Sequence, residues 1–135
     1  MMSPSLALRA SRGRILVVDD DPLIVELLVT LFEQEGFEVQ TAQDGCAGLL
    51  TFFTSHFHLI FTDFSMPRMN GLELAARVRR VDSMVPIILL TGEVNALAAE
   101  AATQAGINRV IPKPFKLDEL RNCLGLVRAE WPPAA

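Results

Sequence analysis

The sequence predicts an α/β fold, a doubly wound sandwich in which helices cover both faces of a parallel sheet. Short apolar runs recur along the chain, segments of helix length with apolar residues at helical spacing separate them, and the two kinds of segment alternate strictly. A chain of 135 residues that is 50% hydrophobic is sufficient for one domain with one substantial core. We therefore expect five strand–helix units joined by right-handed crossovers.

Five strands are predicted, and four of them run directly into polar side chains. These four are short, apolar and bounded by turn signals, which is typical of buried strands in a parallel sheet. They are Ile15–Val18 before Asp19 and Asp20, Leu59–Thr62 before Asp63, Pro86–Leu90 before Thr91, and Arg109–Pro112 before Lys113. The other strand, Phe37–Thr41, alternates apolar and polar residues and is expected near a sheet edge.

The helices are predicted from capping residues and from apolar residues at helical spacing. Asp21 and Pro22 supply an N-cap and a proline at the first helical position, and Asp44 with Gly45 opens the second helix. Glycines at 36 and 106 end two of the helices. The predicted ranges are 22–35, 45–55, 72–80, 94–105 and 117–128.

The expected organisation is one domain with short extensions. We expect residues 1–13 to form a flexible N-terminal extension, residues 14–129 to form the domain, and residues 130–135 to form a C-terminal tail or a truncated linker. No second domain fits, and whether the chain is a stand-alone protein or an excised piece stays open.

Composition excludes several classes of function. The net charge is −4 and the basic residues are scattered, so we expect no direct nucleic-acid binding. No apolar run approaches the roughly 18 residues that a membrane span requires. Cys46 and Cys123 lack metal-ligand spacing and are expected to be free thiols in a reducing compartment. The chain is therefore expected to be cytoplasmic.

Three acidic residues at strand ends indicate a phosphoryl-transfer site. If the first and third strands are neighbours, Asp19, Asp20 and Asp63 converge at the edge where open α/β sheets bind ligands. Like charges at such distances repel, and one lysine, Lys113, is too little to balance them. We expect a bound Mg²⁺ ion to offset the remaining repulsion among the carboxylates, because Mg²⁺ binds through carboxylates and phosphate. A carboxylate beside it can act as a nucleophile, while Lys113 and the Thr91 hydroxyl meet phosphoryl oxygens.

Neighbouring polar residues have simpler interpretations. Asp21 is expected to be a helix cap. His56 and His58 have no third ligand nearby and are expected to be surface residues. A cis bond between Lys113 and Pro114 would aim the lysine inward, but the sequence leaves the isomer open.

Four segments together resemble a known family. Ile15–Pro22, Asp63–Gly71, Leu89–Gly92 and Lys113–Phe115 are similar to the receiver domain of bacterial two-component response regulators, in particular to single-domain regulators of the chemotaxis type. The likeness spans roughly Arg14 to Arg128. It implies a flavodoxin-like (βα)5 sandwich with strand order 2-1-3-4-5.

The resemblance also implies roles for individual residues. Asp63 would be the phosphoacceptor, and Thr91 and Lys113 would sense the phosphoryl group. The phosphoryl donor would be a histidine kinase or a phosphotransfer protein, and the phosphorylated form would act on a downstream protein target or output domain. The chain would be a phosphoacceptor regulator and not an enzyme, because it would catalyse only its own phosphorylation and dephosphorylation. The implied Mg²⁺ ligands are Asp19, Asp20, Asp63 and the main-chain carbonyl of Ser65.

The chain departs from the family pattern at a few positions. Receivers usually carry an aromatic residue three positions before the lysine, where this chain has Val110. A valine has no hydroxyl and few rotamers, so the output surface is expected to respond differently. Ser65 and Glu93 flank the expected path of a hydrolytic water, and we hypothesise that they set the lifetime of the phosphorylated form.

Two alternatives to the phosphorylated switch remain at this stage. One is a receiver-shaped binding module that works without phosphorylation, for which Val110 is the argument. The other is a Mg²⁺-dependent phosphatase of the haloacid-dehalogenase type. That family is characterised by an Asp-x-Asp motif, whereas in this chain Asp63 is followed two positions later by Ser65. The alanine-rich helix over 94–105 is either a partner face or a helix of high propensity. A homodimer would use the face from the fourth to the fifth helix.

Overall fold

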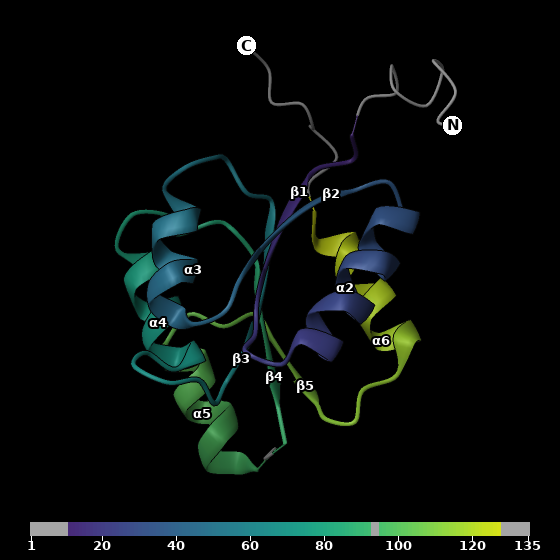
Figure 1. Ribbon diagram of the computed structural model, residues 1–135. Helices are drawn as coiled ribbons and strands as arrows, with labels where there is room; N and C mark the ends of the chain where they lie inside the picture. Colours follow the sequence, from purple (N-terminus) through teal and green to yellow (C-terminus); the bar gives the residue numbers. More distant parts are fainter. Residues whose placement is uncertain (1–10, 93–94, 128–135) are drawn as a thin grey trace, which may run out of the picture.

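A parallel sheet of five strands forms the centre of the molecule, with helices packed on both of its faces (Figure 1). The computed structural model describes residues 11–92 and 95–127. The strand order is β2-β1-β3-β4-β5, and every pair is parallel. This confirms the predicted flavodoxin-like order. The strands are β1 (Arg14–Val18), β2 (Glu38–Ala42), β3 (Leu59–Asp63), β4 (Ile87–Thr91) and β5 (Arg109–Pro112).

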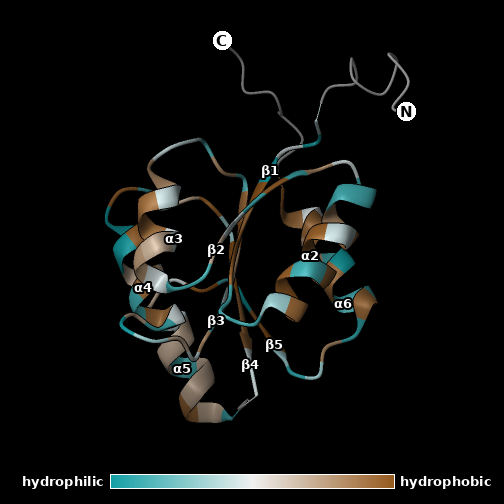
Figure 2. Ribbon diagram, in the orientation of Figure 1, coloured by the Kyte–Doolittle hydropathy of each residue, from teal (hydrophilic) through white to brown (hydrophobic). Residues whose placement is uncertain are grey.

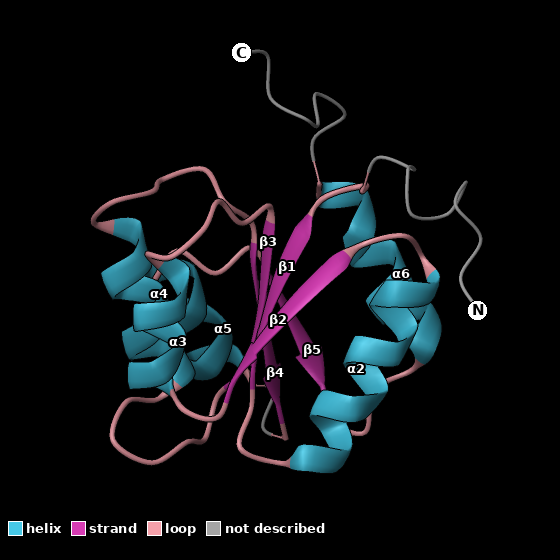
Figure 3. Ribbon diagram, turned by 45° about the horizontal axis from the view of Figure 1, so that its top comes forward, coloured by secondary structure: helices cyan, strands magenta, loops and turns pink. Residues whose placement is uncertain are grey.

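The helices divide into two layers. On one face lie α2 (Pro22–Gln34) and α6 (Leu117–Cys123), with the short 3₁₀ helix η1 (Leu124–Leu126) after α6 (Figure 1). The other face carries α3 (Gly45–Phe52), α4 (Gly71–Arg79) and α5 (Ala96–Gln104), and the turned view separates these two layers clearly (Figure 3). The predicted alternation of strands and helices is thus observed throughout the described residues.

Each face of the sheet has its own hydrophobic core. Successive side chains of a strand point to opposite faces, so Leu16 and Val18 join the core under α3, α4 and α5, while Ile15 and Val17 join the core under α2 and α6. All four side chains are fully buried. Figure 2 shows the result as hydrophobic strands flanked by helices that carry both hydrophobic and hydrophilic residues, with α5 mostly hydrophobic. The central strands are therefore apolar on both faces, as parallel sheets require.

Side-chain caps fix where the helices begin. Asp21 accepts a hydrogen bond from the Leu23 backbone N–H, which confirms the predicted cap. Asp44 accepts one from the Ala47 backbone N–H, which confirms the predicted start of the second helix. Asn70 caps α4 in a capping box with Glu73, each side chain accepting from the other residue's backbone N–H. These bonds satisfy backbone donors that have no partner inside the helix.

Two helices are shorter than predicted. The second helix is predicted to reach Ser55, but α3 ends at Phe52. The fifth helix is predicted to run to Arg128, but α6 ends at Cys123 and the chain continues as the 3₁₀ helix η1. Position 94, the predicted start of the fourth helix, and position 128 lie outside the described residues, as do most of the predicted extension and all of the predicted tail. No helix in the described part of the chain is long and apolar enough to cross a membrane.

The prediction of two surface histidines was wrong for one of them. His56 is exposed, whereas His58 is half-buried and its Nδ1 accepts a hydrogen bond from the Arg14 backbone N–H at 3.0 Å. Burial lowers the pKa of His58, as does the neighbouring His56. His58 therefore joins the starts of β1 and β3 as a neutral structural residue.

Gly71 packs directly beneath the carboxyl end of β3. Its backbone N–H donates to the Phe64 carbonyl at 2.9 Å, which closes the loop between β3 and α4. A Cβ atom at Gly71 would overlap the main-chain carbonyl oxygen of Asp63 and lie 2.8 Å from Leu89 Cδ1. The close approach of α4 to the end of β3 therefore depends on the absence of a side chain.

We predict that Gly71→Ala lowers the free energy of unfolding by about 1–3 kcal/mol, because overpacking forces the backbone to move. Gly125→Ala is the matched control, because a Cβ atom there would meet nothing within 4 Å. Urea unfolding of both variants measures the difference. Equal effects of the two substitutions would contradict the assignment of Gly71 as a close-contact position.

Candidate functional site

The register of the sheet brings the predicted polar residues to one edge. Val18 of β1 lies opposite Thr62 of β3, so the next residues of the two segments, Asp19 and Asp63, emerge side by side. On the other side of β3, Asp63 lies opposite Leu90, one residue before Thr91. The strand neighbours of the sequence-based prediction are therefore confirmed, and the carboxyl ends of three strands meet at one place.

Three carboxylates form a compact cluster at this edge. Asp19, Asp20 and Asp63 each offer an oxygen, and these oxygens all lie within 4.8 Å of one another. Asp19 and Asp63 are buried, while Asp20 is exposed. The cluster is thus anchored in the protein on one side and open to solvent on the other.

Lys113 supplies the positive charge that faces this cluster. Its Nζ donates a hydrogen bond to Asp63 Oδ1 at 2.8 Å and lies 3.7 Å from Asp19 Oδ2. Burial alone lowers the pKa of Lys113, but the hydrogen bond to Asp63 and the charges of both carboxylates outweigh it, so the pKa is raised. The Lys113–Pro114 bond is cis. The lysine is therefore held as a cation, pointing at the acids.

Asp19 is the member of the cluster whose ionised form is disfavoured by its surroundings. Burial raises the pKa of Asp19 to about 6, and the charge of Asp63 adds to this, against a hydrogen bond from the Asp21 backbone N–H to Asp19 Oδ1 at 2.9 Å. Its other oxygen, Oδ2, is buried and has no hydrogen-bond partner among the described residues. One lysine does not neutralise the acids.

The remaining predicted residues lie around this cluster. Thr91 is buried at the end of β4, and its carbonyl accepts a hydrogen bond from the Lys113 backbone N–H at 2.8 Å. Ser65 is exposed on the loop two residues beyond Asp63. Val110 is half-buried opposite Leu89 and packs against the core under α5. Glu93, which we expected near a hydrolytic water, lies outside the described residues.

The donor set fits a magnesium ion. Mg²⁺ takes oxygen ligands, and this cluster offers carboxylate oxygens, one of them the buried and unbonded Oδ2 of Asp19. A divalent cation would also offset the negative charge that the single lysine leaves uncompensated. The described residues contain no other comparable group of three histidine, cysteine or acidic side chains.

Sequence reasoning missed the backbone constraints beneath the site. Gly71 supports the end of β3, and Gly45 allows the Met69 main chain to approach α3. The predicted range of 72–80 also omits Asn70 and Gly71, the N-cap and the first residue of α4. Asparagine followed by glycine is a common turn signal, so only the packing shows that a helix begins here.

The fold and the site together define an α/β domain with an acidic cluster at the carboxyl edge of a parallel sheet. A family model described as "Response regulator receiver domain" matches residues 15–124. The chain belongs to the family of response regulator receiver domains.

Curated relatives and solved structures agree with this assignment. The chain is 38% identical over 109 residues to the DNA-binding response regulator MtrA of Mycolicibacterium smegmatis, which covers 81% of this chain and 47% of the relative. It is also 38% identical to a CpxR homologue of Haemophilus influenzae, over 80% of this chain and 47% of that protein. The chain thus spans about half the length of these relatives.

Among solved structures, chemotaxis protein CheY4 of Vibrio cholerae superposes with a TM-score of 0.81 at 29% identity, over 89% of this chain and 100% of that one. The receiver domain of the Francisella response regulator 1452 gives a TM-score of 0.80 at 28% identity, over 85% and 95%. These neighbours confirm the predicted family and fold.

We predict that Asp19→Asn stabilises the protein at pH 7.5 in the presence of a chelator, by about 1–3 kcal/mol. The folded-state pKa of Asp19 lies near 6, above its ordinary value of 3.8, so ionising this carboxyl destabilises the fold. That cost is absent below pH 4 and complete above pH 6. The asparagine oxygen can still accept the hydrogen bond from Asp21.

Urea unfolding of both proteins at pH 7.5 and at pH 4 measures this effect. The stability difference between the variant and the natural sequence should disappear at the lower pH. Added Mg²⁺ should also narrow the gap at pH 7.5, because a ligand that binds only the folded protein stabilises it. A variant that is less stable at both pH values would contradict the prediction.

Proposed function

We propose that this chain is a phosphorylation-activated switch of a two-component system, which accepts a phosphoryl group on Asp63 and changes its affinity for a partner. The observation that carries the proposal is the position of Lys113, whose Nζ donates to Asp63 Oδ1 at 2.8 Å and faces Asp19 at 3.7 Å. A lysine held this way lies where the negative oxygens of an arriving phosphoryl group need a cation. Membership of the receiver family supports the same conclusion.

The proposed chemistry is a direct transfer to a carboxylate. An oxygen of Asp63 forms a bond to phosphorus while the bond from phosphorus to the donor's histidine nitrogen breaks, and that nitrogen takes up a proton. The product is an acyl phosphate. Lys113 neutralises one phosphoryl oxygen, and the hydroxyl of Thr91 would donate to another. Protein groups thus serve mainly to position the phosphoryl group and to balance its charge.

Mg²⁺ would be held by Asp19, Asp20, Asp63 and the main-chain carbonyl of Ser65. The support is the cluster of acidic oxygens within 4.8 Å of one another and the unbonded Oδ2 of Asp19. When bound, the ion supplies positive charge to the phosphoryl oxygens and offsets the repulsion among the acids.

The phosphoryl donor would be a histidine kinase or a phosphotransfer protein, acting on a cytoplasmic chain. The downstream partner would be a separate protein or an output domain attached to residues 130–135 in a longer protein. The expectation of no direct nucleic-acid binding concerns this domain alone. The relatives named above are DNA-binding regulators, and each is about twice as long as the stretch that this chain matches. A homodimer would use the side of the molecule that runs from α5 past the edge strand β5 to α6. Val110, in place of an aromatic residue, would alter how that face responds.

We predict that acetyl phosphate labels the protein in the presence of Mg²⁺ and that chelator or Asp63→Asn abolishes the labelling. The reason is that the reaction needs a carboxylate at this position and a cation among the acids. Intact-mass spectrometry, with a gain of one phosphoryl group, measures it.

Asp118→Asn is the matched control, because Asp118 is exposed on α6 and does not belong to the acidic cluster of Asp19, Asp20 and Asp63. This variant should label like the natural sequence. A folded protein that binds Mg²⁺ but takes no label would instead favour the phosphorylation-independent binding module. Asp63→Asn labelling as fast as the natural sequence would place the acceptor elsewhere.

We predict that Ser65→Ala and Glu93→Ala each change the dephosphorylation rate by several-fold. Both residues lie two positions beyond a site residue, Asp63 or Thr91, and would flank the water that attacks the phosphorylated carboxyl. Loss of label after the donor is removed, followed over time, gives the rate. If neither substitution changes the rate, these residues do not control the lifetime.

A further inference from the structure

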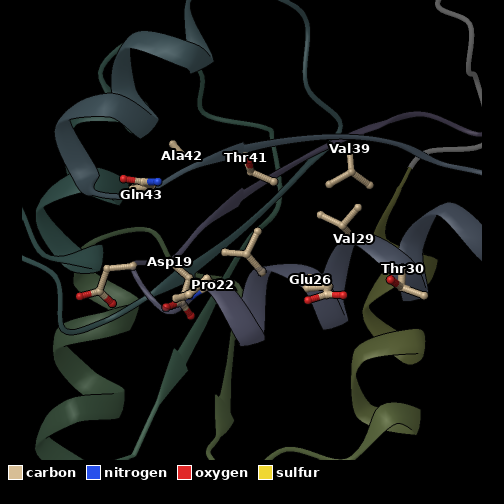
Figure 4. Close-up of a pocket in the computed structure, with 11 residues that line it drawn as sticks. Asp19, Pro22, Glu26, Val29, Thr30, Val39, Thr41, Ala42 and Gln43 are labelled. Carbon is tan, nitrogen blue, oxygen red and sulfur yellow. The ribbon is translucent and has the colours of Figure 1, made fainter.

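The two edges of the sheet differ in the ionisable groups that they carry. At the carboxyl edge, a cavity of about 710 Å³ between α2 and β2 is lined by acids, Asp19 and Glu26 among them (Figure 4). At the amino edge, a cavity of about 230 Å³ borders His56 and His58, which lead into β3. Imidazoles change their charge near neutral pH, so the proton is a ligand to which the amino edge can respond.

Arg14 and His58 hold the starts of β1 and β3 together by two hydrogen bonds. The His58 backbone N–H donates to the Arg14 carbonyl at 2.8 Å, and the Arg14 backbone N–H donates to His58 Nδ1 at 3.0 Å. The second bond uses a side-chain nitrogen where a strand ladder would use a main-chain carbonyl. The attachment of the two strands at this end therefore depends on the charge state of one imidazole.

The bond from Arg14 requires an imidazole without a proton on Nδ1. In a neutral ring one nitrogen carries the proton and the other accepts, so His58 is held with its proton on Nε2. A charged ring carries a proton on both nitrogens and accepts at neither. Its Nδ1–H would then face the Arg14 backbone N–H, and the hydrogen bond at 3.0 Å would be lost.

The surroundings of His58 oppose its protonation. Burial lowers the pKa of His58, and the charges of His56 and Arg14 lower it further. The two imidazole rings lie edge to face with their centroids 4.6 Å apart. The Arg14 guanidinium is held nearby, because it donates to the His56 carbonyl at 3.1 Å and pairs with Glu38 of β2 at 3.0 Å. A proton on His58 would therefore add a third positive group to this end of the sheet.

Asp82, in the loop after α4, lines the same cavity. Its Oδ1 accepts hydrogen bonds from the backbone N–H groups of Met84 and Val85 at 2.8 and 2.9 Å, so this carboxylate oxygen is engaged by its own turn. On the other side, the His58 ring packs on the main chain of Gly13, where a Cβ atom would lie 3.3 Å from His58 Cγ. A ring that turned away from Arg14 would also leave Gly13.

We propose that His58 is a pH-sensitive switch, whose protonation in mildly acidic conditions releases the start of β1 from β3. The attached ring resists the proton, whereas the released ring has the ordinary pKa of 6.5. The attachment is therefore fully favoured above pH 6.5 and weakens as the pH falls below that value. At this end β1 would stay paired with β2, where the Glu38 backbone N–H donates to the Gly13 carbonyl at 2.9 Å. The proposal does not rest on the phosphoryl chemistry at the opposite edge.

Amide hydrogen exchange at Arg14, followed by NMR, tests the switch. At pH 5.5 an imidazole of ordinary pKa is charged and neutral in a ratio of about ten to one, so release becomes up to about tenfold more favourable than at pH 7.5. The protection factor of the Arg14 amide should fall accordingly. Asp19 titrates in the same range, but its protonation favours the fold, so it cannot cause a fall.

His58→Asn keeps an acceptor oxygen for the Arg14 N–H and has no proton to gain, so its Arg14 protection should stay constant between the two pH values. His56→Asn is the matched control and should keep the fall, because His56 is exposed and its side chain does not accept from Arg14. A constant protection factor in the natural sequence, or an equal fall in His58→Asn, would overturn the proposal. A fall that disappears in His56→Asn would assign the titration to the wrong ring and would also overturn it.

The imidazole ¹⁵N resonances of the natural sequence give a second test that needs no variant. At pH 7.5 we expect the His58 proton on Nε2. As the pH is lowered, the charged ring should appear in step with the shift of the Arg14 amide resonance. A proton on Nδ1 at pH 7.5 would reject the switch, as would a charged His58 ring that leaves the Arg14 amide resonance unmoved.

Discussion

One ammonium group facing three carboxylates is the interaction on which the site depends. Lys113 contacts Asp63 directly and lies within ion-pair distance of Asp19, while Asp20 completes the cluster toward solvent. Without the lysine, the buried acids would repel one another with nothing to balance them, and their protonation would be favoured instead. With it, the cluster still carries excess negative charge. That imbalance is what prepares the site for a divalent cation.

The same imbalance links stability to ligand binding. The pKa of Asp19 near 6 means that the folded protein holds this carboxyl ionised at neutral pH at a cost in free energy. A cation placed among the acids removes the cost, so the empty and loaded sites should differ in stability as well as in reactivity.

The apolar layers beneath the site hold the acids close together. β3, and β1 beyond Arg14, are buried between two cores, and their register places Asp19 beside Asp63. Gly71 then lets α4 approach the Asp63 main chain. A shift of any of these strands by one residue would turn its polar end to the opposite face of the sheet. The chemistry of the edge therefore depends on packing several residues away.

The sequence by itself determined the strand–helix order, the starts of the first two helices at Asp21 and Asp44, and the identity of the clustered acids. Those features are local: apolar runs, capping residues such as Asp21 and Asp44, and polar residues placed directly after strands. The likeness of four such segments to receiver domains added the strand order, which the structure confirms.

Tertiary structure alone decided how the charges are shared and where the chain leaves open space. The direction of Lys113, the buried oxygen of Asp19 and the half-buried position of His58 all depend on contacts between distant segments. Local sequence patterns carry propensities, whereas burial and charge balance arise only when separate elements pack together.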